Sequence, residues 1–130
     1  MIRIFLVDDN AMIRSYLRAA LERQDEWVVV GEAEDGRRAL ENWDENAPNL
    51  TVMDFVMPEM NGLEAARELS KEHPEAPILM VTVDPSNQLE EEAKKVGIKG
   101  LCRKCDLDSL FAAIEALIEG KTYFPIPAEA

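Results

Sequence analysis

Acidic side chains occur at the ends of two apolar segments of this chain. Asp8 and Asp9 follow the apolar residues 4–7, and Asp54 ends residues 50–54, which read LTVMD. An ionised carboxylate is costly to bury unless it is paired, binds a metal or lies at the end of a strand. The positions of these three acids therefore suggest that they share a ligand.

A hydroxyl and an amine take the same places in two later apolar segments. Thr82 ends residues 78–82, ILMVT, and Lys104 follows residues 100–103. If these segments are strands of one parallel sheet, their carboxyl ends lie at the edge where open α/β sheets bind ligands. We therefore expect three carboxylates, a hydroxyl and an amine to meet at that edge.

Three neighbouring carboxylates repel one another. At an effective dielectric constant of about 20, a pair ~4 Å apart costs about 4 kcal/mol before screening. A divalent cation removes this cost, and oxygen ligands that leave room for water and phosphate suit Mg²⁺. Lys104 can pair with a carboxylate in the empty site and with a phosphoryl oxygen in the filled one. The set predicts phosphoryl chemistry with a carboxylate as nucleophile.

Short apolar segments alternate with amphipathic segments along the chain. The predicted strands are residues 2–7, 27–30, 50–54, 78–82 and 100–103. The predicted helices follow Asn10, begin at Gly36, follow the loop of Pro58, Asn61 and Gly62, span residues 85–96 and follow Asp106. Such alternation predicts a parallel sheet covered by helices on both faces.

The last helix has the clearest pattern. Six apolar residues follow the 3.6-residue repeat and are expected to face the core: Leu107, Leu110, Phe111, Ile114, Leu117 and Ile118. Asp106 is the expected N-cap and Gly120 the expected stop of this helix.

Length and composition fit one globular domain. The chain has 130 residues, of which 47% are hydrophobic and 31% charged, so extensive disorder is not expected. The apolar run near the N-terminus is too short for a signal peptide or a membrane span, and we expect a cytoplasmic protein without membrane contact. A net charge of −12 repels phosphate backbones and argues against direct nucleic-acid binding.

Four segments resemble the signature segments of a known family. FLVDDN, MDFVMPEMNG, ILMVT and GIKGLCRK are similar, in this order, to those of the receiver domain of two-component response regulators. The resemblance implies a doubly wound, flavodoxin-like (βα)5 fold of the α/β class, with a five-stranded parallel sheet of order 2-1-3-4-5. It implies a receiver domain over residues 1–120, with residues 121–130 as a C-terminal tail or the start of a linker.

The resemblance also implies a role for each acid. Asp54 would accept a phosphoryl group from a sensor histidine kinase or a phosphotransfer protein and become an acyl phosphate. Asp9, Asp54 and the backbone carbonyl of Val56 would bind Mg²⁺ directly, and Asp8 would act through water. Such a domain is a phosphoacceptor switch and not an enzyme, because it carries out only its own phosphorylation and dephosphorylation.

Thr82 and Lys104 would both contact the phosphoryl group. Movement of the loop at Thr82 would repack residues 85–119, the face expected to bind a downstream protein or an output domain, or to form a phosphorylation-dependent homodimer. The resemblance fits either a single-domain regulator or the receiver part of a transcriptional regulator.

Three residues depart from the common receiver pattern. Leu101 stands where many receivers have an aromatic switch residue, and Cys105 stands where many have proline after the lysine. The sequence KCDLDSL instead resembles receivers of the helix-turn-helix (NarL/FixJ-type) subfamily. Val56, two residues after Asp54, has no polar side chain to orient water, so we expect a comparatively long-lived phosphoform.

Two other functions are compatible with the acids alone. A Mg²⁺-dependent phosphohydrolase with an aspartyl nucleophile would use similar chemistry, but such enzymes usually have a second Asp at the position of Val56. A non-phosphorylated interaction module would not need the complete acidic set. Cys102 and Cys105 have the spacing of a redox pair, although Cys102 on a strand fits a core residue better. His73, the only histidine, is expected to be exposed and inert.

Overall fold

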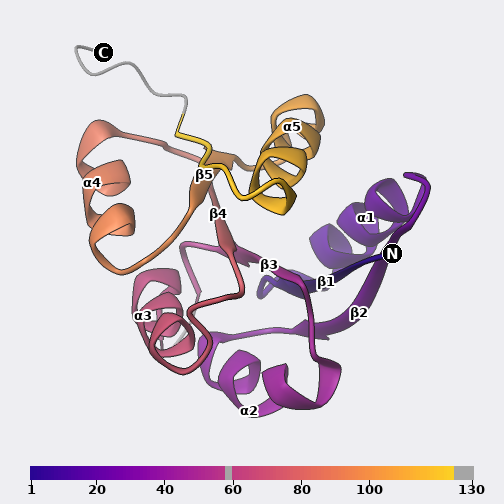
Figure 1. The fold of residues 1–130 in the computed structure, drawn as a ribbon, viewed down its shortest axis with the longest axis horizontal. Helices are drawn as coiled ribbons and strands as arrows, with labels where there is room; N and C mark the ends of the chain where they lie inside the picture. The colour runs from indigo at the N-terminus through magenta and orange to yellow at the C-terminus, as the bar shows by residue number, and fades with distance from the viewer. Residues whose placement is uncertain (58–59, 125–130) are drawn as a thin grey trace.

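The computed structural model describes residues 1–57 and 60–124, which form five strands and five helices in strict alternation (Figure 1). The strands are β1 (Ile2–Val7), β2 (Trp27–Ala33), β3 (Leu50–Asp54), β4 (Ile78–Thr82) and β5 (Gly100–Arg103). The helices are α1 (Ala11–Glu22), α2 (Gly36–Asn46), α3 (Gly62–Glu72), α4 (Asn87–Lys95) and α5 (Leu107–Ile118). All strand pairs are parallel, in the order β2-β1-β3-β4-β5, which confirms the predicted flavodoxin-like α/β fold.

Helices cover both faces of the sheet. In Figure 1, α1 and α5 lie on one side and α2, α3 and α4 on the other. The side chains of β1 alternate between the two cores, because successive residues of a strand point to opposite faces. Ile4 and Leu6 pack with α1 and α5, whereas Phe5 and Val7 pack with the other helices. A sheet buried on both faces explains why the strands are apolar almost throughout.

Polar side chains define where the helices begin. Each N-cap residue accepts a hydrogen bond from a backbone N–H in the first turn: Asn10, Asp35, Asn61, Ser86 and Asp106. The predicted caps at Asn10 and Asp106 are thus confirmed. The Gly120 backbone is left-handed, with φ of +84°, as expected for a residue just beyond a helix end.

Several boundaries and exposures differ from the sequence prediction. β2 continues to Ala33, beyond the predicted end at residue 30, because its pairing with β1 resumes after a register shift. α4 begins at Asn87, since Ser86 caps it, and not at Pro85. Ile118 is 38% exposed and therefore does not belong to the core stripe of α5.

The segment after α5 pairs with the edge of the sheet. The backbone N–H of Tyr123 donates to the carbonyl of Lys99, and the carbonyl of Tyr123 accepts from Leu101. The Lys94 ammonium lies 4.7 Å from the centre of the Phe124 ring, so this segment also contacts α4. Residues 125–130 of the predicted tail lie outside the described residues, as does Pro58 of the predicted loop. Among the described helices, none combines the length and apolar character needed to cross a membrane.

Candidate functional site

The three predicted acids meet at the carboxyl edge of the sheet. Oxygen atoms of Asp8, Asp9 and Asp54 all lie within 4.8 Å of one another. Pairing of Val7 with Met53 in adjacent parallel strands brings the residues that follow side by side. Asp8 is 2% exposed and Asp54 4% exposed, while Asp9 faces solvent. Two buried carboxylates and one accessible carboxylate therefore form a pocket open on one side.

Lys104 enters this pocket from the end of β5. Its Nζ lies 2.9 Å from Oδ2 of Asp54 and 3.0 Å from Oδ2 of Asp8. The contact with Asp54 is a directed hydrogen bond, whereas Oδ2 of Asp8 makes no directed hydrogen bond and forms only an ion pair. The backbone N–H of Lys104 donates to the carbonyl of Thr82 at 2.8 Å, which fixes the lysine beside β4.

Burial and neighbouring charges shift the pKa values of Asp54 and Lys104. Burial raises the pKa of Asp54 above its ordinary value, the hydrogen bond from Lys104 opposes this, and the negative charge of Asp8 adds to the rise. Burial lowers the pKa of Lys104, but its contacts with the carboxylates of Asp54 and Asp8 outweigh burial and leave the pKa raised. The Lys104 ammonium contacts two acids of a cluster of three, so positive charge only partly balances this cluster.

The donor set fits a hard divalent cation. Carboxylate oxygens within a few ångströms of one another, with an open side for water, are the ligands that Mg²⁺ prefers. This acidic triad is typical of the Mg²⁺ site of receiver domains. Burial is the main cause of the raised pKa of Asp54, and the repulsion from Asp8 that a cation would relieve adds to it.

Thr82, the last residue of β4, and Val56, in the loop after β3, both lie near the acids. Thr82 is buried at the end of β4, and its Oγ1 accepts a hydrogen bond from the backbone N–H of Asp84 at 3.3 Å. The backbone N–H of Val56 donates to Oδ1 of Asp54 at 3.4 Å, while Val56 as a whole residue is 64% exposed. Val56 is therefore bonded directly to Asp54, whereas the Thr82 hydroxyl is bonded to the loop that follows β4.

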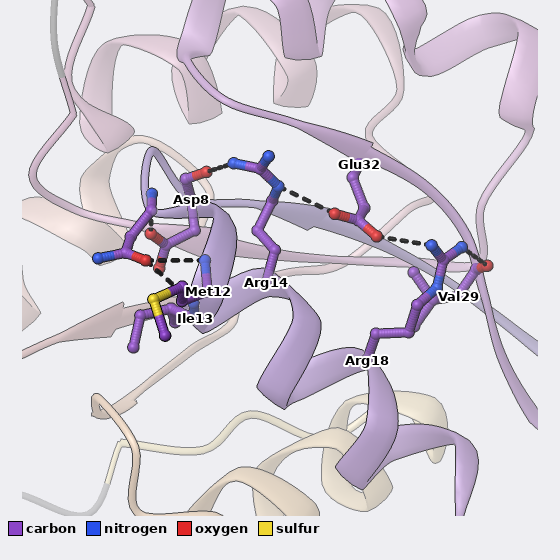
Figure 2. Close-up of polar contacts among 8 residues, drawn as sticks. Asp8, Met12, Ile13, Arg14, Arg18, Val29 and Glu32 are labelled. Atoms are coloured by element: carbon purple, nitrogen blue, oxygen red, sulfur yellow. Dashed lines mark hydrogen bonds and ion pairs between the residues drawn. The ribbon is translucent and has the colours of Figure 1, made fainter.

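The loop between β1 and α1 contains contacts that sequence analysis missed (Figure 2). Asp8 Oδ1 accepts from the backbone N–H of Asn10 at 2.9 Å, and the Asp8 carbonyl accepts from Nη1 of Arg14 at 2.5 Å. Arg14 in turn pairs with Glu32 of β2. In the sequence, Arg14 looks like any polar residue on an amphipathic helix, so these contacts cannot be predicted from the local pattern.

The other residues that the sequence analysis named lie in the core, in a turn or at the end of a helix. Leu101 is fully buried, and Cys105 has a left-handed backbone with φ of +64° in the turn before α5. Cys102 is a buried free thiol, as expected of a core residue, and burial raises its pKa to about 12. His73 is not the exposed residue that was predicted, because it is only 23% exposed and stacks on Trp43 with ring centres 4.0 Å apart.

Comparison with known proteins agrees with this geometry. Residues 4–115 match the family model of the response regulator receiver domain. Transcriptional regulatory protein YdfI of Bacillus subtilis is 35% identical over 119 residues, which are 91% of this chain and 55% of YdfI. Chemotaxis protein CheY of Thermotoga maritima is 37% identical over 97 residues, 75% of this chain and 80% of CheY. A crystal structure of a LuxR-family two-component response regulator from Aurantimonas sp. SI85-9A1 superposes with a TM-score of 0.91 at 33% identity, covering 95% and 89% of the two chains.

Fold, acidic pocket and sequence similarity define a phosphoacceptor domain of two-component signalling, and not an enzyme in its own right. The chain belongs to the response regulator receiver domain family. Within this family it is similar to regulators of the LuxR and NarL type, as the KCDLDSL segment predicts. The chain spans about half the length of YdfI, since the match covers 55% of that protein.

Proposed function

We propose that Asp54 is the phosphoacceptor of this receiver domain. The observation that carries the proposal is the position of its carboxylate at the carboxyl end of β3, within 4.8 Å of Asp8 and Asp9 oxygens and 2.9 Å from the Lys104 ammonium. A carboxylate there can be both nucleophile and cation ligand. Asp8 is the more buried of the two other acids and Asp9 the more accessible, which suits direct binding of a hydrated cation by Asp9.

The reaction transfers a phosphoryl group without net redox change. An oxygen of Asp54 forms a bond to phosphorus, the bond from phosphorus to the donor's imidazole nitrogen breaks, and the donor histidine leaves as neutral imidazole after taking up a proton. A Mg²⁺ held by Asp9, Asp54 and the carbonyl of Val56, with Asp8 acting through water, would neutralise charge on the carboxylates and phosphoryl oxygens.

Two side chains are proposed to hold the product. Lys104 already contacts Asp54 and can follow the charge to a phosphoryl oxygen, because an ammonium binds phosphate as readily as carboxylate. Thr82 is buried at the end of β4 beside β3 and can donate its hydroxyl to another phosphoryl oxygen. Thr82 Oγ1 accepts its present hydrogen bond from the N–H of Asp84, so turning the hydroxyl toward the phosphoryl group would move the start of the β4–α4 loop with it.

The partners follow from this chemistry. A receiver domain requires a phosphodonor, and we propose a sensor histidine kinase or a phosphotransfer protein. The face of residues 85–119, which includes α4, β5 and α5, is proposed to bind a downstream protein, an output domain or a second copy of the chain after phosphorylation. We further propose that the chain acts either as a single-domain regulator or as the receiver part of a transcriptional regulator. The free thiols of Cys102 and Cys105 fit a reducing, cytoplasmic location.

The proposal is tested with a small phosphodonor. The protein is incubated with acetyl phosphate and Mg²⁺, or with beryllofluoride and Mg²⁺, and its mass or spectral change is followed. We expect a Mg²⁺-dependent modification of the wild type that is absent from Asp54→Asn. Wild-type protein that stays unmodified, or Asp54→Asn that is modified equally, would refute the assignment of Asp54.

A further inference from the structure

Arg14 connects the acidic loop to a neighbouring strand. It lies in the first turns of α1, and its guanidinium donates Nη1 to the carbonyl of Asp8 at 2.5 Å and Nε to Oε1 of Glu32 at 2.9 Å (Figure 2). The Arg14 side chain is only 17% exposed, so most of it is held between the loop and β2. A single side chain thus ties the backbone beside the acids to a strand that contributes no acid to the pocket.

A second arginine holds Glu32 from its other side. Nη1 of Arg18 lies 2.7 Å from Oε2 of Glu32, and Nη2 of Arg18 donates to the carbonyl of Val29 at 3.1 Å. Both oxygens of Glu32 are therefore occupied, each by a different arginine of α1. Arg18 does not contact Asp8, and its side chain is 44% exposed. Arg14, Glu32 and Arg18 thus form a network in which Arg14 contacts the acidic loop and Arg18 lies away from it.

The carbonyl that Arg14 holds belongs to the peptide group between Asp8 and Asp9. That group is planar, so fixing the direction of its oxygen also limits the rotation of the backbone on both sides. The N–H of Asp8 is already bonded to the carbonyl of Ala33. The backbone of Asp8 is thus held at its N–H by Ala33 and at its carbonyl by Arg14.

We propose that Arg14, oriented by Glu32, is a positioning residue for the cation site. It acts through the Asp8–Asp9 peptide and not by contact with the cation or the phosphoryl group. This inference rests on the proposed function, because it presumes that the three acids bind Mg²⁺. The role favours arginine, since its planar fork places two nitrogens in fixed directions, Nε on Glu32 and Nη1 on the Asp8 carbonyl, whereas a lysine donates from one nitrogen on a flexible stem.

The matched pair Arg14→Met and Arg18→Met isolates this role. Each variant removes one arginine from Glu32 and keeps an apolar stem, but only Arg14→Met frees the Asp8 carbonyl. Calorimetric titration of the unphosphorylated proteins with Mg²⁺ gives the dissociation constant directly. Partners behind the metal ligands typically change metal affinity about 10-fold or more when removed, and we expect that weakening in Arg14→Met and almost none in Arg18→Met.

Further readouts separate positioning from general stability. Thermal unfolding without Mg²⁺ should place the two methionine variants close together. In phosphorylation by acetyl phosphate, Arg14→Met should need about 10-fold more Mg²⁺ for half-maximal rate yet approach the wild-type rate at saturation, and Arg14→Lys should behave like Arg14→Met. Equal Mg²⁺ affinity in both methionine variants, or restoration by Arg14→Lys, would overturn the role of Arg14. Absence of Mg²⁺ binding by the wild type would instead overturn the proposed function, and the inference with it.

Discussion

The two ends of β3 bury polar side chains in opposite ways. Thr51, near the amino end, is fully buried, and its Oγ1 accepts a hydrogen bond from Nε1 of Trp43 at 2.9 Å. Asp54, at the carboxyl end, is 4% exposed and lies in a pocket with two further acids and one lysine. Thr51 is neutral and satisfied by one neighbour. Asp54 carries a charge that its neighbours only partly balance.

This difference separates stability from function within one strand. A satisfied buried hydrogen bond stabilises the fold and requires nothing from outside the protein. The carboxylate cluster at the other end costs stability while it is empty, and this cost is what makes a cation and a phosphoryl group bind there. We therefore expect substitutions around Thr51 to lower stability and spare phosphorylation. Substitutions around Asp54 should instead change the binding of Mg²⁺ and phosphorylation.

The largest expected effect on folding is at the amino end. Trp43→Ala removes a buried ring that stacks on His73 and leaves the Thr51 hydroxyl without its donor. We expect a loss of about 3–5 kcal/mol in the free energy of unfolding, as for other buried aromatic residues. Urea denaturation measures this loss. At concentrations of urea where the variant is still folded, its phosphorylation by acetyl phosphate should match that of the wild type, and a specific loss of phosphorylation would contradict the comparison.

Lys104→Met should affect both properties. Without its ammonium, the carboxylates of Asp8 and Asp54 lose their only shared positive neighbour in the described part of the chain. We expect a loss of about 1.5–3 kcal/mol of stability without Mg²⁺. Because the pKa of Lys104 lies above its ordinary 10.5, the ammonium is charged at neutral pH, and its stabilising contribution is lost as pH rises through that raised pKa in alkaline solution.

Saturating Mg²⁺ should restore part of the stability that Lys104→Met loses, since the cation replaces the missing positive charge. Denaturation of the variant with and without Mg²⁺ measures this recovery. A variant that is as stable as the wild type without Mg²⁺ would show that the acids do not depend on Lys104.

Mg²⁺ itself should stabilise the wild type and not Asp54→Asn. A ligand at tenfold excess over its dissociation constant adds ~1.4 kcal/mol to the free energy of unfolding. Without Mg²⁺ at neutral pH, Asp54→Asn should be more stable than the wild type, because the substitution removes a buried charge that Asp8 repels. Thermal unfolding of both proteins with and without Mg²⁺ tests the prediction, and an equal Mg²⁺ effect on both would count against it.

The same comparison has a defined pH dependence. The pKa of Asp54 is raised in the folded protein above its ordinary 3.8, so the folded state takes up its proton at higher pH than the unfolded state. The wild type should therefore gain stability relative to Asp54→Asn as pH falls from neutral through that raised pKa, and the gain should level off below 3.8. Denaturation of both proteins across this range measures the difference. A difference that does not vary with pH would contradict a raised pKa.

The smallest expected effect concerns the lifetime of the phosphoform. Val56 is exposed beside the site and offers no polar group to an attacking water. Val56→Asn should shorten the half-life of phosphorylated protein about fivefold, which corresponds to ~1 kcal/mol of activation free energy. Loss of the acyl phosphate after removal of the phosphodonor gives the half-life. A wild-type half-life of seconds would refute the prediction of a long-lived phosphoform.

Much of this arrangement is predictable from the sequence. Apolar runs of the right length, followed by Asp8, Asp54, Thr82 and Lys104, identify both the strands and the edge where those side chains meet. Strand ends are local features, and the geometry of a parallel sheet places them together. The N-caps at Asn10 and Asp106 are likewise local, because each is read from a short polar residue before an apolar repeat.

The unpredicted features all depend on tertiary contacts. The extension of β2 to Ala33 depends on its register with β1. The stacking of His73 on Trp43 joins the ends of two helices. The bond from Arg14 to the Asp8 carbonyl depends on a side chain that turns back along its own helix and is held there by Glu32. The periodic pattern of apolar residues does not predict such contacts.

The most direct test of the central claim is chemical identification of the phosphorylated residue. Protein treated with acetyl phosphate and Mg²⁺ is reduced with borohydride, which converts an aspartyl phosphate to homoserine, and its peptides are sequenced by mass spectrometry. We predict homoserine at position 54 and an unmodified peptide when Mg²⁺ is omitted. Homoserine at another aspartate with Asp54 intact, or none in phosphorylated wild type, would contradict the claim that Asp54 is the phosphoacceptor.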